Sequence, residues 1–86
     1  MKKEVEIMKY NANNGLELCW EENYVIEVKK EDDVIIIANN EGLISLAKHL
    51  LTLAQEEVPY GVHIHFDQYN SLESESVDLI IEKRDL

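Results

Sequence analysis

His63, His65 and Asp67 are the residues whose types and spacing could do metal chemistry, because they alternate within one apolar segment. Alternate residues of a strand point to the same side, so the three side chains would share one face of a sheet. Imidazole and carboxylate groups together suit Zn²⁺ or another divalent ion. A site with two histidines still needs further ligands and groups that orient them. We therefore expect no metal and no cofactor, and we keep a small metal-binding protein or metal-dependent enzyme built on these three residues as an alternative.

The third histidine is expected to lie apart from this group. His49 falls on the polar half of a predicted helix, whereas His63 and His65 project from the sheet face opposite to the apolar residues between them. On that face the two histidines can pair with acids such as Asp78 or Glu82. In that case they would contribute to binding a partner.

No arrangement of residues supports catalysis. Gly15, Gly42 and Gly61 are isolated, so the chain has no phosphate-binding loop. Cys19 has no neighbouring helix N-terminus or basic residue that would stabilise a thiolate, and the serines lack a nucleophile-elbow or triad context. We therefore expect a protein that is not an enzyme.

A polar loop at residues 68–76 combines acidic residues with a tyrosine. Tyrosine is a common anchor in protein interfaces, and carboxylates attract a basic partner. The loop and the strand residues beside it are the predicted partner-binding surface. Its members are His63, His65, Asp67, Tyr69, Glu73, Glu75 and Asp78.

The charge of the chain narrows the class of partner. Its 86 residues include 18 Asp and Glu against 8 Lys and Arg, a net charge of -10. From Glu31 to Glu82 there are eleven acids and one base, so this stretch carries the whole net charge. Nucleic acid is excluded because phosphate binding needs a cationic face, and anionic membrane surfaces are disfavoured for the same reason. A basic protein is the partner that this charge favours.

The expected location is the cytoplasm. A single cysteine cannot form an internal disulfide, which fits a reducing compartment. No apolar run approaches the roughly 20 residues needed to span a bilayer, and the N-terminus lacks the apolar core of a signal peptide.

Length and patterning predict one α+β domain over residues 1–86. A helix of about 17 residues is expected to begin at a cap on Asn39 or Asn40, to end before Pro59, and to pack its leucines on a sheet. The expected sheet is mostly antiparallel and has about six strands, in the order β-β-β-β-α-β-β. These strands lie at residues 2–10, 16–20, 24–30, 34–38, 62–67 and 77–82.

One predicted strand needs cover on both faces of this sheet, and the single predicted helix can supply only part of that cover. Residues 34–38 are a continuous β-branched run ending in alanine, which predicts a central strand buried on both faces. A single helix covers only part of one face of such a sheet. The rest must curl, face water or be covered by a partner subunit, so a structural homodimer is a second alternative.

The second half of the chain resembles a family of small bacterial immunity proteins from polymorphic toxin systems. The resemblance covers about residues 40–83. It rests on Gly42-Leu43 opening a helix rich in Leu and Ala, on Val62-His63-Ile64-His65-Phe66-Asp67, and on Leu79-Ile80-Ile81-Glu82. It implies a non-enzymatic inhibitor that binds and blocks a cognate toxin in the cytoplasm, and it transfers no toxin-contact residues. The leading hypothesis is therefore an acidic protein-binding module that neutralises a bacterial toxin.

Overall fold

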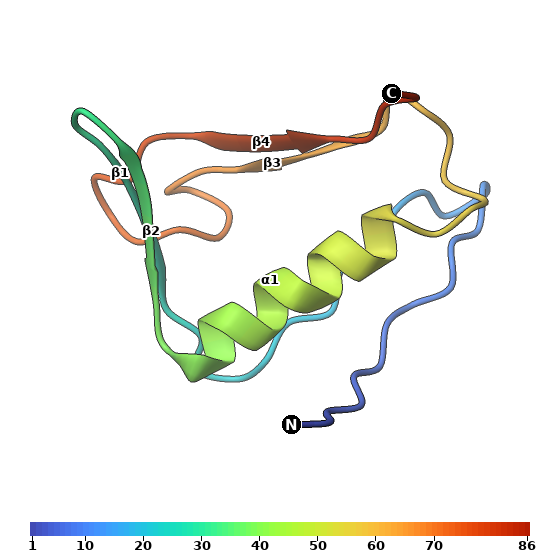
Figure 1. The fold of residues 1–86 in the computed structure, drawn as a ribbon, viewed down its shortest axis with the longest axis horizontal. Helices are drawn as coiled ribbons and strands as arrows, with labels where there is room; N and C mark the ends of the chain where they lie inside the picture. The colour runs from blue at the N-terminus through green and yellow to red at the C-terminus, as the bar shows by residue number, and fades with distance from the viewer.

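The computed structural model describes all 86 residues as a small α+β fold with one helix and four strands (Figure 1). The strands form two separate antiparallel pairs, β1–β2 and β3–β4, so the predicted single sheet of about six strands is wrong. The elements are β1 (Ile26–Lys30), β2 (Val34–Ala38), α1 (Asn40–Leu53), β3 (His63–Phe66) and β4 (Leu79–Glu82).

The two strands predicted before Glu21 are missing from the fold. The chain does reverse at Asn11–Gly15, where Gly15 has a φ of 71° and two backbone N–H groups donate to the Asn11 carbonyl. The segments on either side do not pair beyond that one bridge. Instead, the side chain of Gln55 accepts from the N–H of Tyr10 at 2.9 Å and donates to the carbonyl of Met8 at 3.0 Å. A side chain just after the end of α1 thus satisfies backbone groups that a neighbouring strand would otherwise bind.

Asn39 caps α1, as the sequence predicts. Its Oδ1 accepts from the N–H of Gly42 at 2.8 Å and from the N–H of Val25 at 2.9 Å. Its Nδ2 donates to the carbonyl of Asn23 at 2.9 Å. The cap therefore fixes the start of the helix against the segment that leads into β1.

The orientation of α1 differs from the prediction. Leu43, Leu50 and Leu51 belong to the half expected to pack inward, yet their exposed fractions are 54%, 49% and 50%. Three residues of the half expected to face solvent are instead fully buried, namely Ser45, His49 and Thr52. The helix therefore buries a stripe at the border between its polar and apolar halves, with Leu46 and Leu53 as its apolar members.

This orientation follows from what the polar side chains bind. Ser45 Oγ accepts from the N–H of Glu21 at 2.8 Å, and His49 Nε2 lies 3.1 Å from the carbonyl oxygen of Cys19. The Lys48 ammonium group is 3.0 Å from the Glu21 carboxylate. The extended chain before β1 thus lies along the polar side of the helix and is held there by its side chains.

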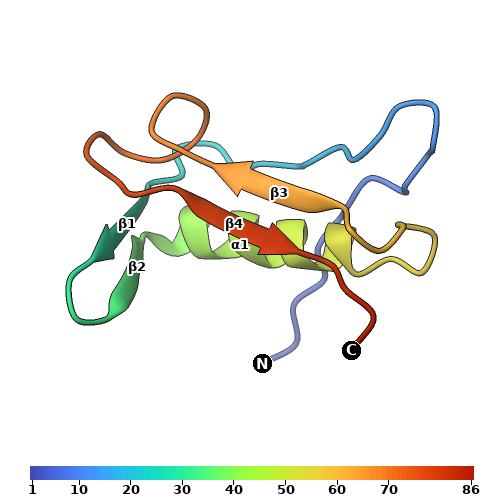
Figure 2. The ribbon, with the colours of Figure 1, turned by 90° about the horizontal axis from the view of Figure 1, so that it is seen from above.

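The core lies between α1 and the β3–β4 pair, and the β1–β2 hairpin closes one end of it (Figures 1 and 2). Trp20 and Phe66 flank the buried ring of His49, with centroid distances of 4.1 and 5.6 Å. The buried apolar residues are Ile26, Val28, Leu46, Leu53, Val58, Ile64, Phe66 and Leu72.

β2 is an edge strand, so the prediction that it is central and buried on both faces is wrong. Val34 to Ile37 are all exposed, by 43% to 59%. The other edge of β1 is occupied, because Glu73 N–H donates to the Ile26 carbonyl and Val77 N–H donates to the Val28 carbonyl, both at 2.9 Å. β1 is therefore the inner strand of this region, and β2 lies at its margin.

Gly42 is required where α1 passes β1 and β2. A Cβ at this position would collide with the carbonyl oxygen of Val25 and lie 3.0 Å from Ile26 Cγ1 and 3.1 Å from Ala38 Cβ.

We expect Gly42→Ala to lower the free energy of unfolding by about 1–3 kcal/mol, because this overpacking exceeds the gain in helix propensity. Urea unfolding measures the change. Asn40→Ala, at an exposed position two residues earlier, is the control, and equal effects of the two changes would contradict the packing argument.

His49 makes stability depend on pH. Burial lowers its pKa below the ordinary 6.5, opposed by the hydrogen bond to the Cys19 carbonyl. Since that carbonyl can only accept, Nε2 carries the proton and buried Nδ1 has no partner. The unfolded chain takes up a proton at a higher pH than the folded chain, so stability should fall as the pH drops below 6.5.

Urea midpoints measured from about pH 7.5 to about pH 5.5 test this dependence. A His49→Gln variant keeps His63 and His65 but cannot titrate at the buried position. Its midpoint should therefore fall less steeply than that of the unaltered protein. Parallel curves for the two proteins would show that His49 does not carry the effect.

Candidate protein-binding surface

The first part of the loop between β3 and β4 is organised by Asp67. Its Oδ1 accepts from the N–H groups of Tyr69 at 2.8 Å and Asn70 at 3.0 Å. Asn70 returns the interaction, because its Oδ1 accepts from the N–H of Asp67 and its Nδ2 donates to the carbonyl of His65, both at 3.0 Å. Asp67 therefore shapes the loop, and its neighbour Tyr69 is left 90% exposed.

The second part of the loop is bound along β1. The Ser76 hydroxyl accepts from the N–H of Val28 at 3.1 Å, between the two backbone bonds from Glu73 and Val77 described above. Leu72 and Ser76 are buried, at 4% and 7% exposure. The side chains of Glu73 and Glu75 remain exposed. The backbone of this part of the loop is thus held along β1, and its acidic side chains lie at the surface.

Glu75 adopts a φ of 70°, a left-handed conformation that residues other than glycine seldom take. Its N–H donates to the Gln68 side-chain oxygen at 3.2 Å. A non-glycine residue held in this region is often found where a loop has a functional role. The conformation is compatible with the exposed position of the Glu75 carboxylate.

His65 and Asp78 lie within hydrogen-bonding distance of each other beside the β3–β4 pair, with Nε2 and Oδ2 2.8 Å apart. This is the pairing of a histidine with an acid that the strand alternation predicts. His63 lies opposite Glu82 in the strand register, but Glu82 pairs with Arg84. The hydrogen bond from the Arg84 guanidinium lowers the pKa of the Glu82 carboxyl.

The structure does not bring His63, His65 and Asp67 together as metal ligands. The Asp67 carboxylate accepts hydrogen bonds from its own loop, and His65 pairs with Asp78. His49 lies in the core, on the opposite side of β3 from the exposed histidines. No group of three or more His, Cys, Asp or Glu side chains is placed to hold a metal ion.

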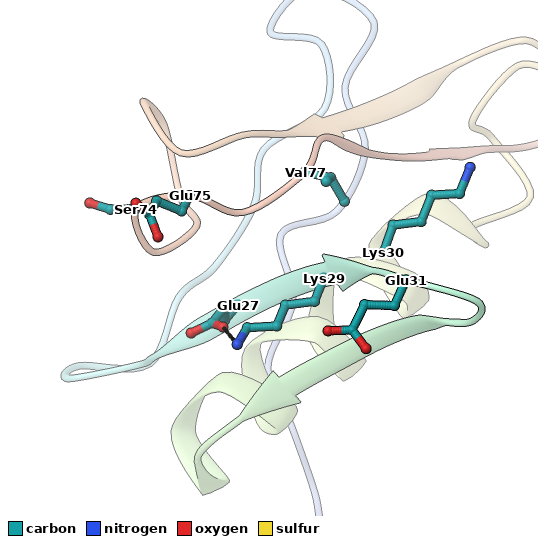
Figure 3. A pocket seen from close by; sticks show the side chains of 7 residues that line it. All are labelled: Glu27, Lys29, Lys30, Glu31, Ser74, Glu75 and Val77. Atoms are coloured by element: carbon teal, nitrogen blue, oxygen red, sulfur yellow. Dashed lines mark ion pairs between the residues drawn. The ribbon is translucent and has the colours of Figure 1, made fainter.

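Residues of β1 and of the loop together line a shallow hollow, and its lining includes two lysines that the sequence reasoning did not select (Figure 3). Lys29 Nζ is 3.1 Å from Glu27 Oε1, and this hydrogen bond raises the pKa of Lys29. Glu31 and Glu75 also line the hollow and add to the effect. The register of β1 was the signal that could have placed Lys29 beside Glu27, since the two residues share one strand face. The surface is therefore predominantly acidic but carries positive charge at this point.

The acidic segments gather at one end of the molecule. The turn between β1 and β2 contains Glu31, Asp32 and Asp33, and it lies at the same end as the loop between β3 and β4 (Figures 1 and 2). That end therefore presents most of the carboxylates that the sequence concentrates between Glu31 and Glu82.

Comparison with protein families finds one matching model, immunity protein 32, over residues 33–84. That stretch is 52 of the 86 residues and takes in β2, α1, β3, the acidic loop and β4. The chain belongs to the immunity protein 32 family. The resemblance to immunity proteins inferred from the sequence is thus confirmed. Comparisons with curated proteins and with solved structures give no match.

The matched region of this immunity protein leaves out residues 1–32, and with them β1. The acidic loop lies inside the match, although the strand that binds it lies outside. The single helix is too short or too polar to cross a membrane.

Asp67 and Glu73 should respond differently to truncation. Asp67→Ala removes the acceptor of two loop N–H groups and should lower the free energy of unfolding by about 1–2 kcal/mol. Glu73→Ala removes an exposed side chain and should change it by no more than about 0.5 kcal/mol. Urea unfolding of both variants gives the comparison. A neutral Asp67→Ala would mean that the loop does not depend on this carboxylate.

Proposed function

We propose that this immunity protein acts without catalysis, by binding a basic domain of a cognate toxin in the cytoplasm. The toxin-binding surface consists of Tyr69, Glu73, Glu75 and Asp78, with His63 and His65 at its margin and Asp67 holding the loop in shape. The observation that carries this proposal is the binding of the loop along β1, which holds the loop backbone while the side chains of Glu73 and Glu75 stay exposed. A surface organised before binding loses little conformational entropy when the partner arrives.

The charge of the chain supports a basic partner. A net charge of -10, with most of the carboxylates from Glu31 to Glu82 at one end, creates a field that speeds the approach of a positively charged domain. Many toxins that act on nucleic acids carry such a basic surface, since phosphate binding requires one. An acidic inhibitor can occupy the same surface in place of the nucleic acid.

Tyr69 supplies the apolar part of the surface. Its ring is 90% exposed, and it stands beside Asp67 in a loop held by hydrogen bonds. An exposed aromatic ring in an acidic loop matches the usual composition of an interface, where an anchor is enclosed by polar residues. The alternative of a metal protein built on His63, His65 and Asp67 has no such support, because these side chains do not converge.

Co-expression with the product of the adjacent gene tests the function itself. If that product is the toxin, the immunity protein should restore growth and copurify with it in a one-to-one complex. If growth is not rescued and the proteins do not copurify, the toxin-neutralising role with that product is wrong.

Charge reversal tests the surface. A Glu73→Lys, Glu75→Lys, Asp78→Lys triple variant should slow association with the toxin domain by about 10- to 1000-fold, because it reverses the local field. Its matched control reverses Glu4, Glu56 and Glu57, three exposed acids elsewhere in the chain, and so changes the net charge equally. Association rates come from stopped-flow or surface-based kinetics, and urea midpoints verify that both variants fold. If the two triple variants slow association equally, only net charge matters and this surface is not the binding site.

A further inference from the structure

The four residues Val34 to Ile37 form a row of exposed apolar side chains on β2. Their exposed fractions are 59%, 45%, 43% and 48% in chain order. An exposed apolar edge strand can pair with a strand of another chain through its free backbone groups. Folded proteins usually block such pairing with charge, proline or a covering segment. β2 has none of these blocks between Val34 and Ala38.

The hydrogen-bond register shows which backbone groups of β2 are free. Glu31 N–H donates to the Asp33 carbonyl, and Asn39 N–H donates to the Val25 carbonyl. Because bonded and non-bonded pairs alternate in an antiparallel ladder, Ile35 and Ile37 bond to β1. The N–H and carbonyl groups of Val34, Ile36 and Ala38 therefore point away from β1, and no hydrogen bond in the structure reaches them.

We propose that a second copy of this chain adds its β2 to this edge, antiparallel and about a two-fold axis at Ile36. In that register Ile36 faces its own counterpart, and Val34 faces Ala38 of the second copy. All the free groups of the edge then find partners, because each facing pair exchanges two hydrogen bonds. The arrangement is self-complementary, as a two-fold dimer requires.

The absence of charged side chains on β2 favours a second copy over a basic toxin at this edge. The strand carries no charged side chain from Val34 to Ala38, so a basic partner finds no carboxylate to pair with there, and a second copy meets no like charge. At the end of the strand, the same register sets Asp33 against Asn39 of the second copy, which is neutral, and the strand direction ends there because α1 begins at Asn40. The backbone of the proposed toxin-binding loop is bound to the other edge of β1, on the opposite side of the hairpin from the free edge of β2.

This dimer and the toxin complex should respond oppositely to salt. Two chains with a net charge of -10 repel each other, so added salt should strengthen dimerisation. Added salt should weaken binding of a basic toxin to the acidic surface. The inference does not depend on toxin binding, and either proposal can fail without the other.

Sedimentation equilibrium of the full chain tests the dimer. The mass should rise from 10.0 kDa toward twice that value with concentration, and it should do so at lower concentration in high salt. Ile36→Pro should weaken association by at least about tenfold, because it removes an edge N–H that makes no bond within the chain. Ile36→Val keeps that N–H and should associate within a few-fold of the unaltered protein. A mass of 10.0 kDa at every concentration and salt overturns the proposal, as does normal dimerisation of Ile36→Pro.

Amide hydrogen exchange of the unaltered protein gives a second readout that does not depend on a variant folding. The Ile36 amide should exchange slowly at concentrations where the dimer forms and rapidly on dilution. The Ile35 and Ile37 amides, which bond to β1, should stay protected throughout. An Ile36 amide that becomes protected only when the toxin domain is added assigns the edge to the toxin and overturns the second-copy proposal.

Discussion

Side chains of α1 and of the residues that flank it, rather than a neighbouring strand, bind the backbone of the chain that precedes β1. Gln55 binds Met8 and Tyr10, Ser45 binds Glu21, and the Asn39 cap binds Asn23 and Val25. These contacts require the polar stripe of the helix to face inward, because its side chains must reach an extended backbone lying beside it. The exposure of Leu43, Leu50 and Leu51 is the consequence, since turning one stripe inward turns the opposite stripe outward.

Local signals in the sequence were sufficient for the start of the helix, the Asn11–Gly15 reversal and the pairing of His65 with Asp78. Each of these three features depends on residues close in the chain or on strand alternation. These two kinds of signal can be recognised in the sequence without tertiary context. The inward face of α1 was not predictable in this way. A helical wheel assumes that the most apolar stripe is buried, but here hydrogen bonding to an irregular segment determines which stripe is buried. The prediction that His49 lies on the polar, outward half of the helix was wrong for the same reason.

The run of β-branched residues in β2 shows another limit of sequence reasoning. Apolar residues on consecutive positions indicate that both faces of a strand are covered, but they do not say by what. In the single chain Ile35 and Ile36 are 45% and 43% exposed, so no element of the fold covers them fully. The pattern therefore reflects either an assembly or an exposed edge, and only the register identifies which backbone groups are free. The sequence also did not reveal that Asp67 shapes its loop by accepting hydrogen bonds. A carboxylate that shapes a loop and one that binds a partner cannot be distinguished from the sequence.

The β1–β2 hairpin separates two kinds of surface that would interfere if they were mixed. Its β1 edge is occupied by the acidic loop, whose bonds to Ile26 and Val28 leave carboxylates outward. Its β2 edge is free, apolar and without charge. A basic partner gains electrostatic energy at the first edge and none at the second, whereas a second copy meets repulsion at the first and a self-complementary strand at the second. One hairpin can thus hold two partners of different chemistry on opposite edges, because charge attracts the basic partner only to the first edge and repels a second copy only there.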